Sequence, residues 1–100
     1  MFDWQQVVGF EWDEGNARKN AEKHDVSQAE AEQMFFNEPL VIAPDLFHSG
    51  DEIRLHALGK TDEGRKLHAT FTLRSHGSKI RIISARNMSR KERNYYEKHT

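Results

Sequence analysis

Cysteine is absent from this sequence, so it offers neither a disulfide framework nor a thiolate for catalysis or metal binding. Long apolar runs are also missing, because no stretch approaches the roughly 20 residues that cross a bilayer as a helix. The opening residues, MFDWQQVVGFEWDEG, show no basic start and no continuous apolar segment of the kind that directs secretion. We therefore expect a protein of the cytoplasm with no membrane-spanning segment.

Motifs for metals and nucleotides are missing as well. The sequence contains no H-x-x-x-H or H-E-x-x-H pair, and without cysteine the common zinc ligand sets are unavailable, so no metal and no other cofactor is expected. The segment GKTDEGR (59–65) resembles a phosphate-binding loop in letters only, because it lies between predicted strands and no helix follows it.

Charge is plentiful but unevenly distributed along the chain. Residues 1–52 hold 12 acidic and 3 basic side chains, a net charge of −9, whereas residues 53–100 hold 4 acidic and 12 basic ones, a net charge of +8. Such asymmetry indicates either a basic surface that faces a polyanion or two halves that neutralise each other in the fold. The length of 100 residues suits one apolar core, so residues 1–100 are expected to form a single domain.

Hydrophobic periodicity predicts an α+β fold in the order β-α-α-β-β-β-β-α. The helix starts are marked by Asp13 as an N-cap and by two capping boxes, Ser27 to Glu30 and Ser89 to Glu92. Short turns between the later strands predict an antiparallel sheet, packed on the two N-terminal helices and followed by a C-terminal helix. The expected strands are 8–12, 40–43, 52–60, 67–74 and 79–86, and the expected helices are 14–24, 27–36 and one after Ser89.

Alternation along the strands separates an apolar face from a polar one. An antiparallel sheet can leave one face in water, and a face rich in Arg and His favours a phosphate ligand. Arg86 lies beyond Ile83, where the alternation breaks, so it caps a helix carbonyl, pairs with an acid of the first half or reaches the polar face. The predicted core face carries Ile53, Leu55, Ala57, Leu67, Ala69, Phe71, Leu73, Ile80 and Ile82, and the polar face carries Arg54, His56, His68, Arg74 and Arg81.

These residue types suit RNA cleavage without a metal. The reaction needs a base for the 2′-hydroxyl proton, an acid for the leaving 5′-oxygen and cations for the charge on the phosphoryl oxygens; histidine supplies the first two and arginine the third. The two candidate histidines, His56 and His68, share the polar face, whereas His48, His76 and His99 are predicted to be exposed. Tyr95 and Tyr96 either stack on bases or anchor the last helix, and the pattern favours anchoring.

Three blocks of the sequence, in order, carry a resemblance to a known family. They are FEWDEGNARKNAEKHDV (10–26), the pair Glu52 and Arg54 followed by Gly59, and IRIISARNMSRKERNYYE (80–97). The chain resembles the BrnT family of type II toxin-antitoxin systems, whose members have a RelE-like fold. The resemblance implies a toxin that cleaves RNA without a metal and is neutralised by a ribbon-helix-helix, BrnA-like antitoxin. It also implies binding of promoter DNA through the antitoxin alone, in a dimer or a heterotetramer with that partner.

The resemblance also bears on individual residues. It implies that Arg54 and Arg81 belong to the active face and that Arg86, Lys23 and His24 lie near it, although a basic helix end explains the last two equally well. A non-catalytic RNA-binding or partner-binding module, or a degenerate toxin that only holds its partner, stays open as an alternative. The candidate catalytic residues are Arg54, Arg81, Arg86, His24, His56 and His68, and the candidate RNA contacts are Lys23, Arg74 and Arg90.

The chain departs from the family pattern at two positions. Asp25 stands where glycine is common, and Gln28 stands where an aromatic residue is common. Aspartate tolerates the left-handed backbone conformation, so the first helix is still expected to end there.

Overall fold

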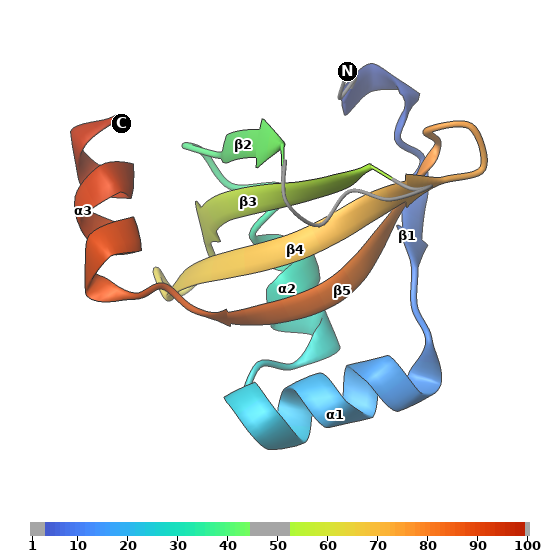
Figure 1. Ribbon diagram of the computed structural model, residues 1–100, viewed down its shortest axis with the longest axis horizontal. Coiled ribbons are helices and arrows are strands. Elements are labelled where there is room, and N and C mark those ends of the chain that lie inside the picture. Colours follow the sequence, from blue (N-terminus) through green and yellow to red (C-terminus); the bar gives the residue numbers. More distant parts are fainter. Residues whose placement is uncertain (1–3, 45–52, 100) are drawn as a thin grey trace.

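The predicted order of elements is confirmed by the computed structural model, which describes residues 4–44 and 53–99 (Figure 1). Within these ranges, no helix is both long and apolar enough to cross a membrane. A short 3₁₀ turn that the sequence did not predict precedes the first strand. The elements are η1 (Trp4–Gln6), β1 (Gly9–Glu11), α1 (Glu14–His24), α2 (Gln28–Gln33), β2 (Val41–Pro44), β3 (Arg54–Lys60), β4 (Lys66–Arg74), β5 (Lys79–Asn87) and α3 (Arg90–Lys98).

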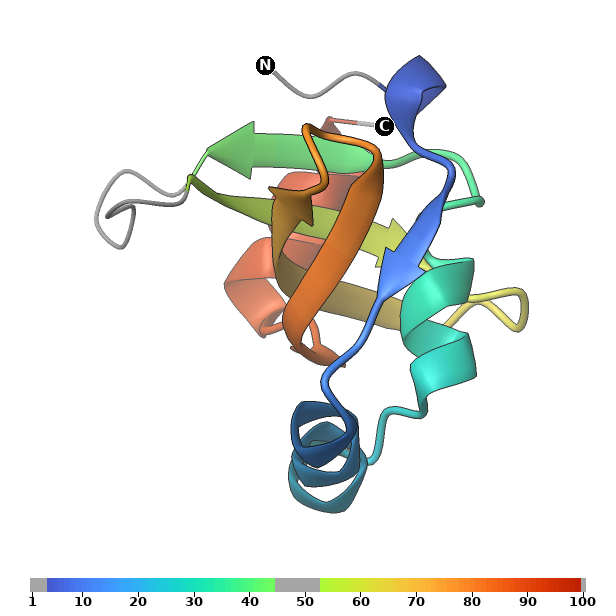
Figure 2. The same ribbon diagram turned by 90° about the vertical axis from the view of Figure 1, so that its right-hand side faces the viewer.

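The five strands form one sheet in the order β1-β5-β4-β3-β2 (Figure 2). Strands β2 to β5 are the antiparallel meander that the short turns predicted. Strand β1 adds to the other side of β5 in parallel, with Glu11 opposite Arg81, a pairing that the sequence alone did not indicate. This pairing brings residues of the acidic N-terminal half beside the basic last strand.

Each predicted helix start is confirmed in the structure. The Asp13 side chain accepts a hydrogen bond from the backbone N–H of Asn16, and both capping boxes are complete. Helix α1 ends as expected, because Asp25 adopts the left-handed conformation with φ of 54° and its N–H bonds to the carbonyl of Ala21.

The apolar core lies between α2 with the turn that follows it and the predicted core face of the sheet. Phe35 fills its centre, with its ring 5.1 Å from that of Phe71 and 5.7 Å from that of Phe10. One expectation was wrong: Ile53 precedes β3 rather than belonging to it, and it is 66% exposed. The buried cluster consists of Val26, Ala31, Met34, Phe35, Ala57, Leu67, Ala69, Phe71, Ile80, Ile82 and Ala85.

A β-bulge in β5 explains the break in alternation at Ile83. Phe71 pairs with Ile82, whereas the preceding Thr70 pairs with Ser84, so Ile83 is an extra residue in its strand. The extra residue restores the apolar face after the break and places Ala85 in the core. It also brings Arg86 to the same face as Arg81, although five positions separate them.

Helix α1 lies along the edge of β5 that β1 leaves open (Figure 1). The Asn16 side chain donates to the carbonyl oxygens of Ile82, at 3.3 Å, and Ile83, at 2.7 Å. The buried Asn20 accepts from the N–H of Ala85 at 2.7 Å. Two asparagines therefore replace a neighbouring strand and satisfy backbone groups that an open edge would expose.

Candidate functional site

The polar face of the sheet is a series of cross-strand rows. Alternate residues along a strand are about 7 Å apart, so the first and last of three successive rows are separated by about 13 Å. The predicted site residues therefore do not converge on one point. The rows are Arg54 with Thr72 and Arg81, His56 with Thr70 and Ser84, and Leu58 with His68 and Arg86.

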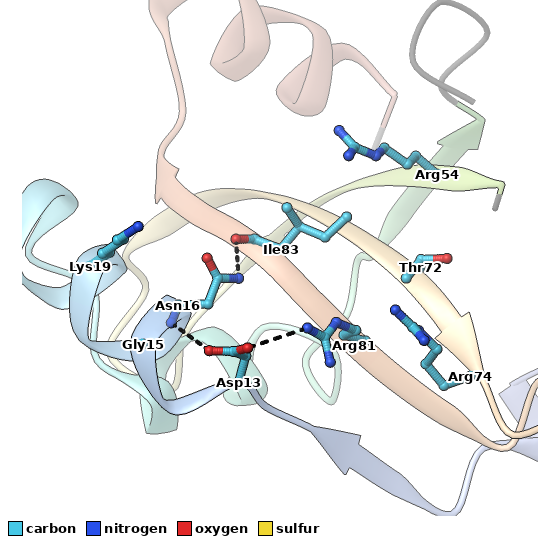
Figure 3. Close-up of a pocket in the computed structure, with 9 residues that line it drawn as sticks. All are labelled: Asp13, Gly15, Asn16, Lys19, Arg54, Thr72, Arg74, Arg81 and Ile83. Carbon is cyan, nitrogen blue, oxygen red and sulfur yellow. Dashed lines mark hydrogen bonds and ion pairs between the residues drawn. The ribbon is translucent and has the colours of Figure 1, made fainter. Parts of the chain in front are cut away.

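The first row opens into a hollow of about 400 Å³. Arg54 from β3, Arg74 from β4 and Arg81 from β5 border it, and Lys19 of α1 lies on the opposite side (Figure 3). Arginine donates several hydrogen bonds in a fixed fork that matches phosphate oxygens. The full lining is Asp13, Gly15, Asn16, Lys19, Arg54, Thr72, Arg74, Arg81 and Ile83.

Two carboxylates hold Arg81 in place within this hollow. Its guanidinium lies 3.4 Å from Glu11 Oε1 and 3.7 Å from Asp13 Oδ2. The Arg81 side chain nevertheless remains 26% exposed. The guanidinium is therefore oriented before any ligand arrives and still has surface available for one.

Helix α3 covers the opposite end of the polar face. Its Glu92 receives two hydrogen bonds from Arg86, of 2.8 and 2.9 Å, in a bidentate pair. Burial raises the pKa of Glu92, but hydrogen bonds from the Arg86 side chain and the Ser89 backbone outweigh it and lower that pKa to about 2. The hydrogen bond to Glu92 raises the pKa of Arg86 in turn. Arg86 thus binds an acid of its own half of the chain.

His68 is buried at this covered end. Its ring lies 4.8 Å from that of His56, and its Nε2 lies 4.0 Å from Glu92. Burial, with a smaller contribution from the positive charge of Arg86, outweighs the opposing effect of the Glu92 charge and lowers the pKa of His68 to about 4. His68 is therefore uncharged at neutral pH, and within residues 4–44 and 53–99 its buried Nδ1 has no hydrogen-bond partner.

A second hollow, of about 190 Å³, continues from the first between α1 and β5. Lys23 and His24 line its far end, while Asn16, Lys19 and Ile83 line both hollows. The basic end of α1 therefore faces the same groove as the arginines.

The structure brings together three of the predicted residues in the first hollow: Arg54, Arg74 and Arg81. Lys23 and His24 lie in the adjoining hollow, and His56, His68 and Arg86 follow along the sheet toward α3. Arg90 begins α3, is exposed and lines neither hollow, and His48 lies outside the described residues.

Sequence reasoning missed Lys19 and the second role of Asp13. Asp13 was expected to be an N-cap, and the i, i+4 spacing of Lys19 and Lys23 was available as a signal. What the sequence did not supply was the position of α1 along β5.

One of the two tyrosines anchors the last helix, as the sequence pattern favoured. Tyr96 is buried, and its hydroxyl donates a hydrogen bond to the carbonyl of Pro39. Tyr95 is instead 50% exposed and stacks on His99.

The fold and the hollow define a small α+β protein with a cationic site on a mainly antiparallel sheet. The model of the family described as "Ribonuclease toxin, BrnT, of type II toxin-antitoxin system" matches residues 12–92. The chain therefore belongs to the BrnT family of ribonuclease toxins, as the sequence resemblance implied.

The fold agrees with that of a solved structure. The crystal structure of the ribonuclease toxin BrnT from Brucella abortus is similar, with a TM-score of 0.63 and 21% sequence identity; the match covers 84% of this chain and 100% of that one. A search of curated proteins gave no match.

Proposed function

We propose that this chain cleaves RNA without a metal ion and that the first hollow binds the scissile phosphate. The observation that carries the proposal is the convergence of Arg54, Arg74 and Arg81 from three neighbouring strands on one hollow. Three arginines can surround a phosphoryl group and stabilise the charge that develops on its oxygens. Arg81 contributes most to this stabilisation, because Glu11 and Asp13 already orient its guanidinium.

In the proposed reaction the 2′-hydroxyl oxygen attacks the neighbouring phosphorus. A base removes the hydroxyl proton, the bond from phosphorus to the 5′-oxygen breaks, and an acid gives that oxygen a proton. The products are a 2′,3′-cyclic phosphate and a free 5′-hydroxyl. The protein supplies the cations and the proton carriers, so the atoms and electrons balance without a co-reactant.

Two histidines outside the lining of the hollow are the candidates for carrying these protons. His56 is two residues from Arg54 on the same strand face, about 7 Å along it, and its Nδ1 is 3.3 Å from Thr70 Oγ1. His24 lies at the far end of the adjoining hollow. We assign proton transfer to His56 ahead of His24, and we leave His68 out because it is buried, lines neither hollow and, with its pKa lowered to about 4, is a weak base.

The test is cleavage of an end-labelled RNA by the purified chain in excess chelator. We expect cuts from the wild type, loss of cutting in Arg81→Ala, and normal cutting in Arg93→Ala, which removes an exposed arginine of α3. All three proteins must show the same far-UV circular dichroism. Cutting that persists in Arg81→Ala, or that disappears in chelator, contradicts the proposal.

A second candidate is an RNA-binding module that does not cleave. It is favoured by one observation: the lining of the first hollow, within the described part of the chain, includes no histidine. Salt-sensitive binding of RNA that stays intact, and stays intact also in the presence of ribosomes, would select this candidate.

Family membership implies an antitoxin partner, and we propose the finer details. The partner is a ribbon-helix-helix, BrnA-like antitoxin, the two form a heterotetramer in the cytoplasm, and DNA is bound through the antitoxin alone. The toxin contributes residues 1–100 as one domain, a view supported by the single apolar cluster of the described residues. Light scattering of the co-expressed complex tests the stoichiometry, and a promoter-shift assay with each component alone tests which one binds DNA.

A further inference from the structure

The two hollows form one groove between α1 and β5. Asn16, Lys19 and Ile83 line both, so the arginine end and the end at His24 adjoin along the same helix. Residues 16 to 24 of a helix span about 12 Å. Three or four stacked nucleotides at roughly 3.4 Å each fit this length.

The charged residues of α1 lie on two different faces of the helix. Asn16 and Asn20 bond to β5, and Lys19 and Lys23 form the neighbouring stripe, one turn apart. The other charged residues of the helix, Glu14, Arg18 and Glu22, share a stripe farther round and line neither hollow. The helix therefore presents lysines to the groove and keeps its two acids out of it.

The two lysines are available for a ligand. Both are exposed, and neither forms an ion pair or side-chain hydrogen bond within the ranges 4–44 and 53–99. Figure 3 shows the Lys19 side chain extending from α1 on the side of the hollow opposite Arg54. The half-buried Ile83 lies between them and gives the groove an apolar floor.

We infer that this groove binds single-stranded RNA next to the scissile phosphate, with Lys19 and Lys23 each holding a backbone phosphate. The inference rests on the proposed function, since it places the phosphate of the arginine hollow and those of the lysines on one strand. Duplex-binding domains span about 16 base pairs across two minor grooves, whereas this groove is about 12 Å long. Its concave shape and single line of cations suit one backbone.

The experiment measures binding of a 2′-O-methyl decanucleotide, which cannot be cleaved, by fluorescence anisotropy at several salt concentrations. Each phosphate contact to a single strand contributes about 0.7 to the slope of log K against log salt. We expect Lys19→Gln to weaken binding about three- to tenfold and to reduce the slope by about 0.7, and Lys19→Gln with Lys23→Gln to reduce it by about 1.4. Arg18→Gln removes the same charge from the outer stripe and is the matched control.

Equal slopes for Lys19→Gln and Arg18→Gln would overturn the inference, because a diffuse field would then explain binding. Absence of decanucleotide binding by the wild type, or equally strong binding of a duplex of the same sequence, would overturn it as well. The cleavage assay fails or succeeds separately. Lysine-dependent slopes in a protein that leaves RNA intact with and without ribosomes support the groove and refute the nuclease, whereas cleavage with unchanged slopes refutes the groove and keeps the nuclease.

Discussion

The two ends of the polar sheet face use the same residue types in different ways. At the open end, Arg54 and Arg81 border a hollow of about 400 Å³. At the covered end, α3 brings Glu92 onto Arg86 and closes over His68. Both Arg81 and Arg86 are already paired with carboxylates, so the difference between the two ends is that only Arg81 borders a hollow that other cations also line. We therefore expect the open end to determine activity and the covered end to determine stability.

The largest expected effect comes from comparing alanine substitutions of the two arginines, Arg81 at the open end and Arg86 at the covered end. Arg81→Ala should lower the cleavage rate about 10²- to 10³-fold, the loss typical of one preorganised charge-stabilising group, with little change in the free energy of unfolding. Arg86→Ala should do the reverse and reduce the free energy of unfolding, because Glu92 would keep a partly buried charge without its partner. Single-turnover cleavage and urea denaturation of both variants check this, and a large activity loss in folded Arg86→Ala would break the comparison.

The next effect concerns Glu92, the acid that pairs with Arg86 at the covered end. Glu92→Gln should reduce the free energy of unfolding by about 2 kcal/mol, since it removes the charge-assisted pair with Arg86 and weakens the capping box at Ser89. Glu97 is 54% exposed and pairs with Lys66 at the surface, so Glu97→Gln should change stability by less than about 0.5 kcal/mol. Similar losses in the two variants would show that α3 does not depend on the buried pair.

Lowering the pH should reduce the stability of the fold through protonation of His68 at the covered end. Its pKa is about 4 in the fold and about 6.5 in the unfolded chain, so between these values the unfolded chain binds the extra proton. Stability attributable to His68 is complete above pH 6.5 and falls by about 2 to 4 kcal/mol as the pH drops to 4. Glu92, with its pKa near 2, loses its contribution only below about pH 4.5.

Urea denaturation across this pH range separates the two groups. His68→Leu should flatten the profile between pH 6.5 and 4 and leave the loss at lower pH, whereas His76→Asn, at an exposed turn, should keep the wild-type shape. If the free energy of unfolding of His68→Leu depends on pH as that of the wild type does, protonation of His68 does not cause the loss of stability.

The smallest effect concerns an uncharged residue of the open end. Thr72 is buried, and its hydroxyl donates to the carbonyl of Ile53 at 2.9 Å. Thr72→Val keeps the shape and should cost about 1 kcal/mol in thermal or urea denaturation. A loss of unfolding free energy as large as that of Glu92→Gln would mean that the open end contributes as much to stability as the covered end.

Local rules predicted much of this arrangement. Period-2 alternation placed Arg54 and Arg81 on one face, and the capping rules located the starts of the helices, because both depend on neighbours in sequence. The parallel pairing of β1 with β5, the approach of Lys19 to the arginines and the pairing of Arg86 with Glu92 depend on how elements meet in space. The break in alternation at Ile83 was visible in the sequence. That it brings Arg86 to the polar face could be known only from the register of β4 and β5.

The asparagine contacts between α1 and β5 limit how the groove can open. Asn16 and Asn20 satisfy backbone groups of the strand edge, so moving α1 outward would expose those groups and leave an edge on which another chain could add a strand. One wall of the proposed RNA groove is thus also the protection of the sheet against self-association. Substrate has to fit a groove of fixed width, and variants that loosen α1 should lose solubility together with RNA binding.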